Sequence, residues 1–182
     1  MSDAVFSSDR PERAFWTAWA ICAIALATIA GAWFFQLVLG IRPCPMCLEQ
    51  RYAYYVAIPL AAVLAVMAAR QVPKSLLVAG FAVLFCVIVF NSAFGVYHAG
   101  VEWGFWPGPN ECTGAGVDFG SPGNLLENLK TAKVVRCDEV QWSFLGLSLA
   151  GYNALISALM AALAGWGLMG LGPGVRHKSP VN

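Results

Sequence analysis

Two cysteines separated by two residues lie between two long apolar segments of this chain. Cys44 and Cys47 occur in the stretch 43–51, which reads Pro-Cys-Pro-Met-Cys-Leu-Glu-Gln-Arg. This spacing lets the two sulfurs form a small reversible disulfide or supply half of a metal site. If a helix starts near Leu48, its positive end and the cation of Arg51 both favour a thiolate at Cys47. The stretch therefore predicts a reactive dithiol at a membrane surface.

Redox exchange competes here with a structural bridge and with a metal site. A bridge that closes so small a loop removes little chain entropy, so stabilisation alone is a weak reason for it. A zinc site usually has a second pair of cysteines, or histidines, close enough to complete four ligands. The two histidines, His98 and His177, are instead expected on opposite sides of the membrane. The residues favour the redox interpretation, and no metal is expected at the pair.

The other four cysteines are of two kinds. Cys112 and Cys137 share one long polar segment, which can close on itself at modest entropic cost. A lone bridge there is usually a structural staple, but two pairs on the same side can pass electrons by thiolate exchange. Disulfides persist in oxidising compartments, so both pairs are expected on the outer side. Cys22 and Cys86 fall in apolar segments, where a thiol is expected to be protonated and inert.

The composition is that of a membrane protein. Of 182 residues, 59% are hydrophobic and 12% are charged, against roughly 25% charged in an ordinary soluble domain. The net charge is +1 and no basic run occurs, so the chain lacks the electrostatic footprint of a nucleic-acid-binding protein. The lipid bilayer is its expected environment.

Four apolar segments are long enough to position these cysteines as membrane-spanning helices. A spanning helix needs about 20 apolar residues. The sequence predicts an all-α four-transmembrane-helix bundle that forms a single domain over residues 1–182. A short amphipathic helix is expected at 124–130, and the basic residues favour cytoplasmic termini. The predicted spans are approximately 14–39, 52–69, 76–97 and 142–171, and the outer loops are 40–51 and 98–141.

The chain resembles the DsbB family of bacterial inner-membrane disulfide bond formation proteins. The first matching stretch is 44–51, Cys-Pro-Met-Cys-Leu-Glu-Gln-Arg, after the first span. The second is Tyr97-His98 at the end of the third span, and the last is Cys137 followed by 141–147, Gln-Trp-Ser-Phe-Leu-Gly-Leu. The resemblance covers nearly all of the chain from the first span to the fourth.

The resemblance implies a thiol:quinone oxidoreductase with its cysteine loops in the periplasm. A periplasmic DsbA-like thiol oxidase would attack the Cys112–Cys137 disulfide. Cys137 would then exchange with Cys44, freeing Cys47 as a thiolate beside a quinone from the membrane pool, ubiquinone rather than menaquinone. Relays of this kind proceed by thiolate exchange between disulfides of different reduction potential.

The resemblance also implies a quinone site that includes Arg51 and His98, to which Glu102 is added as a candidate because it lies four residues after His98. The segment 100–106 departs from the best-known members, which leaves a paralogue serving a different thiol partner as an alternative. A vitamin K epoxide reductase-like quinone reductase is another, although its loop pair would precede the reactive pair. A non-catalytic membrane protein with cross-linked loops, or a metal carrier, is the alternative outside the enzymes.

Overall fold

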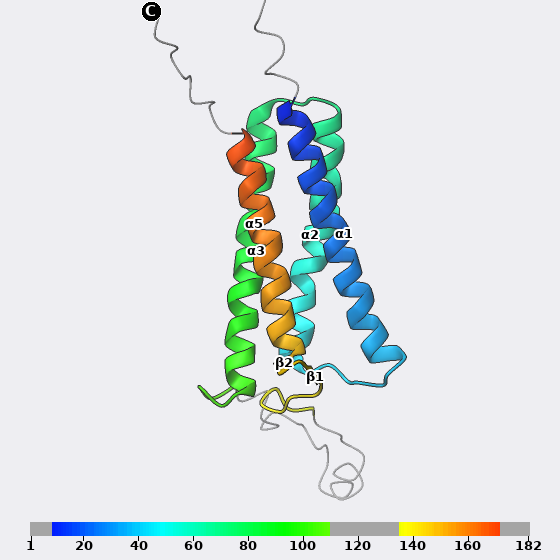
Figure 1. The fold of residues 1–182 in the computed structure, drawn as a ribbon, viewed down its shortest axis with the longest axis vertical. Helices are drawn as coiled ribbons and strands as arrows, with labels where there is room; N and C mark the ends of the chain where they lie inside the picture. Colours follow the sequence, from blue (N-terminus) through cyan, green and yellow to red (C-terminus); the bar gives the residue numbers. More distant parts are fainter. Residues whose placement is uncertain (1–8, 110–134, 172–182) are drawn as a thin grey trace, which may run out of the picture.

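The computed structural model describes residues 9–109 and 135–171. In these ranges four long helices lie side by side, and each is long and apolar enough to cross a membrane (Figure 1). This confirms the predicted all-α bundle of four transmembrane helices, whereas the amphipathic helix expected at 124–130 lies outside the described residues. The elements are α1 (Asp9–Leu37), α2 (Pro45–Ala69), α3 (Lys74–Glu102), β1 (Ser143–Phe144), β2 (Leu147–Ser148) and α5 (Leu149–Leu171).

Helix α2 begins at Pro45 rather than near residue 52, so the dithiol belongs to the helix terminus. Cys44 is its N-cap residue, and the Cys44 sulfur accepts a hydrogen bond from the Cys47 backbone N–H at 3.2 Å. Pro45 lies in the first turn, where its missing N–H has no helical partner to lose. The polar residues between Cys47 and residue 52 are therefore helical, although hydropathy alone assigned them to a loop.

Helices α3 and α5 also differ from the predicted spans. The backbone hydrogen bonds of α3 continue to Glu102 rather than ending at residue 97, so His98 lies in the helix and not in the loop after it. Helix α5 begins at Leu149 rather than at residue 142, because the antiparallel hairpin of β1 and β2 takes up the preceding residues. Leu145 and Gly146 have φ values of 50° and 78° in its turn, the positive values that a tight two-residue hairpin turn requires.

Small residues bring the helices close together. Helix α3 packs most extensively on α5, and α1 on α2. A Cβ atom at Gly95 of α3 would lie 3.0 Å from the backbone of Ala154 of α5, so a larger residue would push the two helices apart by a few tenths of an ångström. His98, on α3, and Asn153, on α5, are near this crossing in sequence. The close contact therefore holds the two helices that carry these side chains.

The reactive residues gather at one end of the bundle. The start of α1, the turn between α2 and α3 and the end of α5 lie together at the top of Figure 1. The loop before α2, the end of α3 and the hairpin lie together at the opposite end (Figure 1). The first cysteine pair and the segment around Cys137 therefore share one end of the molecule.

Candidate redox site

Cys44 and Cys47 form an asymmetric pair of free thiols. Their sulfur atoms are 2.7 Å apart, with the Cys44 thiol donating to the Cys47 sulfur. Cys44 is 2% exposed, whereas Cys47 is half-buried. The hydrogen bond to Cys47 and burial raise the pKa of the Cys44 thiol above its ordinary value. Cys44 therefore keeps its proton, and a negative charge on the pair belongs on Cys47, near the positive end of α2.

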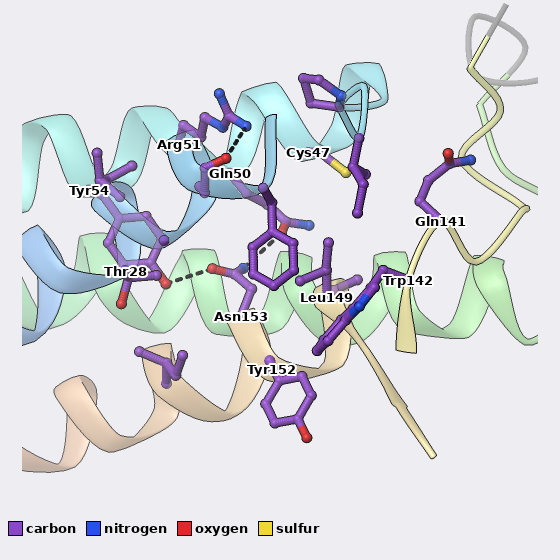
Figure 2. A pocket seen from close by; sticks show the side chains of 18 of the residues that line it. Thr28, Cys47, Gln50, Arg51, Tyr54, Gln141, Trp142, Leu149, Tyr152 and Asn153 are labelled. Atoms are coloured by element: carbon purple, nitrogen blue, oxygen red, sulfur yellow. Dashed lines mark hydrogen bonds between the residues drawn. The ribbon is translucent and has the colours of Figure 1, made fainter. Parts of the chain in front are cut away.

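A cavity of about 700 Å³ opens beside Cys47. Figure 2 shows the Cys47 side chain among residues of α1, α2 and α5 and of the segment that leads into the hairpin. The lining is mostly apolar, with a few polar groups. An apolar cavity with a few convergent polar groups is typical of a small-molecule site. Its lining includes Cys47, Gln50, Arg51, Tyr54, Gln141, Trp142 and Asn153.

Arg51 brings a buried positive charge to this cavity. Its side chain donates to Gln36 Oε1 at 2.7 Å and to the Ala32 carbonyl at 3.5 Å, and its guanidinium lies 5.4 Å from the centre of the Trp33 ring. In the described part of the chain, no carboxylate lies within 4.0 Å of it. A buried cation without a counter-ion favours the appearance of negative charge nearby. Arg51 is therefore suited to stabilise a thiolate or a reduced, anionic acceptor.

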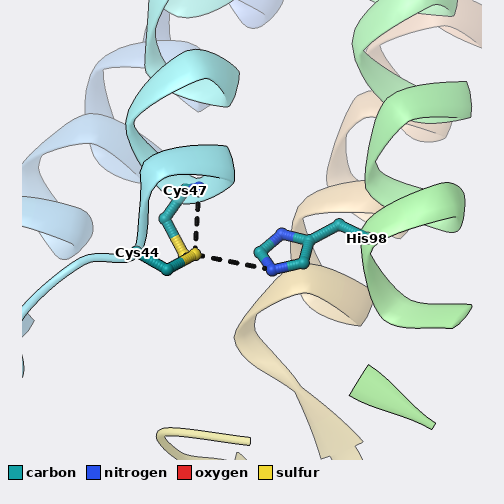
Figure 3. A group of neighbouring side chains, drawn as sticks. All are labelled: Cys44, Cys47 and His98. Atoms are coloured by element: carbon teal, nitrogen blue, oxygen red, sulfur yellow. Dashed lines mark hydrogen bonds between the residues drawn. The ribbon is translucent and has the colours of Figure 1, made fainter. Parts of the chain in front are cut away.

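His98 lies against the other sulfur, that of Cys44 (Figure 3). Its Nε2 atom is 3.5 Å from Cys44 Sγ, and its ring also hydrogen-bonds the Cys137 main chain. Gln50 Nε2 donates to His98 Nδ1 at 2.9 Å, so the ring proton of neutral His98 is on Nε2 and faces Cys44. Glu102 Oε1 lies 4.0 Å from the same Nε2 atom.

The two candidates on α3 are thus grouped with Cys44 and not with the cavity. Neither His98 nor Glu102 is among the residues that line the cavity, whereas Arg51 is. That His98 and Glu102 bind a quinone stays a prediction.

Cys137 is brought into contact with the first pair. It is 1% exposed and shares a small buried cluster with Cys44 and Met46, against which Cys47 and Val135 also pack. Cys137 is disulfide-bonded, and none of the other four cysteines in the described ranges is its partner, because all are free. Its predicted partner Cys112 lies outside the described residues. The structure therefore places Cys137 in the same buried cluster as Cys44.

A network of buried polar side chains behind His98 was not predicted. Gln50 Oε1 accepts from Asn153 at 2.8 Å, and Asn153 Oδ1 accepts from the Tyr54 hydroxyl at 2.6 Å. Tyr54 in turn lies 3.1 Å from the Ser157 hydroxyl, to which Asn91 also donates at 2.9 Å. The sequence does hold a signal, because polar residues four apart within apolar helices commonly face the bundle interior.

Comparisons with known proteins show the family to which this chain belongs. A family model described as disulfide bond formation protein DsbB matches residues 12–167. A protein of Azoarcus sp. named disulfide bond formation protein B is 32% identical over 162 residues, covering 83% of this chain and 90% of that protein. The protein of the same name from Polaromonas sp. is 28% identical over 144 residues, with 75% and 79% covered. No solved structure matches the chain.

The family match extends over all four helices and includes both Cys44 and Cys137. It confirms the resemblance seen in the sequence and, with it, the predictions of disulfide oxidoreductase chemistry and of a multi-pass membrane protein. Cys137 shares a buried cluster with Cys44, and thiol–disulfide exchange, the chemistry of such proteins, proceeds through direct attack of one sulfur on another. The chain belongs to the DsbB family of disulfide bond formation proteins.

Proposed function

We propose that this protein reoxidises a periplasmic DsbA-like dithiol and passes the electrons to a quinone of the membrane pool. One observation carries the proposal. Cys137 packs against Cys44 in a buried cluster, while Cys47 opens onto a largely apolar cavity that also contains Arg51. The proposed electron route therefore runs from Cys137 to Cys44, then to Cys47 and the cavity. In this proposal the cysteine-bearing end of the bundle faces the periplasm and both termini are cytoplasmic.

The exchange step uses only the chain's own sulfurs. The thiol partner reduces the second disulfide and leaves Cys137 as a thiolate. Its sulfur attacks Cys44 of an oxidised Cys44–Cys47 pair, forming a Cys44–Cys137 bond and releasing Cys47 as a thiolate with the electron pair of the broken bond. Departure of Cys47 is favoured because this sulfur lies near the helix N-terminus and the cation of Arg51, which stabilise its charge.

The cavity residues fit a quinone. A quinone head group is an apolar ring with two carbonyl oxygens, and the cavity offers an apolar lining with the buried Arg51 as a charged hydrogen-bond donor. Arg51 would hold a carbonyl oxygen, and Trp142 and Tyr54 supply aromatic surface. A bound quinone would supply a two-electron acceptor. Gln36 and the Ala32 carbonyl hold the guanidinium in place for this contact.

The test is quinone-dependent turnover by the purified, intact chain in lipid nanodiscs. A reduced DsbA-like dithiol protein is mixed with ubiquinone or menaquinone, and both thiol loss and quinone reduction are followed. We expect turnover that needs a quinone and is faster with ubiquinone. Cys47→Ser should abolish it, because the released thiolate is lost, whereas Cys86→Ser should retain it, since Cys86 is an exposed free thiol on α3. Full quinone-dependent turnover in Cys47→Ser would contradict the proposal.

A further inference from the structure

Three side chains of metal-ligand type meet at the dithiol, and a fourth, that of Glu102, lies beside His98. Cys44 and Cys47 come from the start of α2, and His98 and Glu102 come from the last turns of α3. The two sulfurs and one ring nitrogen of His98 all lie within 4.8 Å of one another (Figure 3). Glu102 Oε1 adds a carboxylate oxygen 4.0 Å from His98 Nε2. Two thiolates, an imidazole and a carboxylate are all groups that zinc takes as ligands.

The spacing of Cys44, Cys47 and His98 is close to that of three ligands of a tetrahedral site. With zinc bonds of about 2.3 Å to sulfur and about 2.0 Å to nitrogen, ligand sulfur and nitrogen atoms lie roughly 3.5 Å apart. Cys44 Sγ and His98 Nε2 are 3.5 Å apart. The sulfur–sulfur separation must widen from 2.7 Å to about 3.8 Å. Rotation of the two cysteine side chains supplies this change, so the helices can keep their places.

Glu102 provides an independent sign that a cation belongs here. Its side chain is 6% exposed, and its Oε2 atom has no hydrogen-bond partner within the described ranges. Ser148 hydrogen-bonds the carboxylate, which leaves this second oxygen unsatisfied. A buried carboxylate oxygen without a partner is costly, because it has lost its hydration without replacement. A cation held by the neighbouring sulfurs and imidazole would remove that cost.

The network of buried polar side chains that begins at Gln50 can stabilise the tautomer of His98 that binds a metal. To bind a cation through Nε2, the ring gives up its bond to the Cys137 main chain and carries its proton on Nδ1. Gln50 then accepts this proton through its amide oxygen, and Asn153 turns its own amide in response. Tyr54 and Ser157 are hydroxyl groups that donate and accept equally well, so the chain of bonds can reverse its direction. Metal-bound histidines are usually held by such a partner on the second nitrogen.

We propose that the reduced protein binds one divalent cation of the zinc class through Cys44, Cys47, His98 and Glu102. Binding releases the two thiol protons to solvent and transfers no electrons. The oxidised Cys44–Cys47 disulfide offers no thiolates and does not bind the cation. The cation would occupy the lone pairs with which these sulfurs react, so zinc holds the dithiol in its reduced form and inhibits turnover.

Cobalt(II) is the probe for binding, since its visible spectrum reports thiolate ligands and tetrahedral geometry. The intact chain carrying Cys112→Ser and Cys137→Ser is reduced and titrated with cobalt(II), then with zinc as a competitor. We expect one equivalent bound to the reduced chain and none to the oxidised chain. His98→Ala and Glu102→Gln should each weaken binding by at least about tenfold, and Gln50→Leu, which removes the support of the ring, by about 10- to 100-fold. Glu49→Gln is the matched control, because Glu49 is exposed on the same helix.

Zinc-edge X-ray absorption of the reduced chain without further substitutions keeps the test independent of how well these variants fold. Two sulfur and two nitrogen or oxygen neighbours support the site. The proposal is overturned if the reduced chain binds no zinc, if two sulfurs are accompanied only by water so that the His98 and Glu102 variants bind as well as their parent, or if the oxidised chain binds equally. No quinone or thiol partner is present in these measurements, so a negative result leaves the proposed electron route intact.

Discussion

The two sulfurs of the Cys44–Cys47 pair face opposite kinds of surroundings. Cys47 faces an open, mostly apolar cavity that contains the buried cation of Arg51. Cys44 is buried in a cluster with Met46 and Cys137, and His98 lies against it with Glu102 beside the His98 ring. One side of the dithiol can therefore receive a small apolar molecule, whereas the other is already occupied by protein groups that include a further sulfur.

The charges on the two sides of the dithiol also differ. Arg51 is a buried cation without a carboxylate partner among the residues described, and Glu102 has a buried carboxylate oxygen without a hydrogen-bond partner there. The first favours negative charge on Cys47 and the second opposes it on Cys44. The pair is therefore polarised. Cys44 is suited to sulfur exchange, and Cys47 is suited to hold the released charge.

The largest effect short of removing a cysteine is expected from the cavity side. Arg51→Gln should lower quinone-dependent turnover by about 10²-fold or more, because a preorganised charged donor at a site of developing negative charge contributes on this scale. Formation of a Cys44–Cys137 bond in a single turnover should slow by much less, since the N-terminus of α2 still stabilises the Cys47 thiolate that this step releases. Stopped-flow quinone reduction and acid-quenched mass spectrometry measure the two steps.

Arg136→Gln is the matched control for this substitution. Arg136 is exposed and pairs with Asp138 and Glu139 at the surface, and surface pairs typically contribute about 0–1 kcal/mol. Turnover should stay close to that of the unsubstituted protein. If Arg51→Gln slowed sulfur exchange as much as it slowed quinone reduction, the two sides of the dithiol would not be separate in function.

A smaller effect is expected when the two thiols are compared by alkylation. Because hydrogen bonding to Cys47 and burial raise the pKa of Cys44, its thiol form persists into the alkaline range. Iodoacetamide should therefore modify Cys47 first in the reduced protein at neutral pH, and modification of Cys44 should increase only as the pH rises well above neutrality. Peptide mass spectrometry over a pH series reads this out. Preferential modification of Cys44 at neutral pH would reverse the proposed polarity.

The smallest effect is expected at Cys22, which belongs to neither side. Its thiol is buried on α1 and makes one long contact of 3.7 Å to the Ile58 carbonyl. Cys22→Ala should leave turnover unchanged and cost about 1 kcal/mol of stability, the usual size of a small buried truncation. Thermal melting and the turnover assay check both statements. A loss of turnover without a loss of stability would assign Cys22 a part in the electron route.

Hydropathy and spacing were sufficient to predict the four-helix bundle and the grouping of Cys47 with Arg51, which line the same cavity. The length of an apolar segment predicts a spanning helix. A separation of four residues places Arg51 one helical turn from Cys47 and on the same face of the helix. The predicted start of α2 was wrong, because hydropathy shows where polar residues occur and not where helical backbone hydrogen bonds begin. The cap formed by Cys44 is a contact between a side chain and the backbone, and no apolar pattern records it.

The surroundings of Cys44 could not be predicted from the sequence. Whether His98 faces the cavity or the far side of the dithiol depends on how α3 is rotated about its axis, and close packing at Gly95 and Ala154 fixes that rotation. The approach of Cys137 likewise depends on long-range packing around Met46. Local spacing carries no information about either contact.

The most direct test of the electron route is the bond between Cys44 and Cys137. In the intact chain with Cys47→Ser and Cys112→Ser, mild oxidation should join Cys44 to Cys137, as seen by mass spectrometry of the digested protein. The free thiols of Cys22 and Cys86 serve as internal controls, because neither shares the cluster of Cys137. A dominant Cys44–Cys137 linkage is the predicted result. Failure of that linkage to form in a folded protein, or its formation at random with Cys22 and Cys86, would contradict the account.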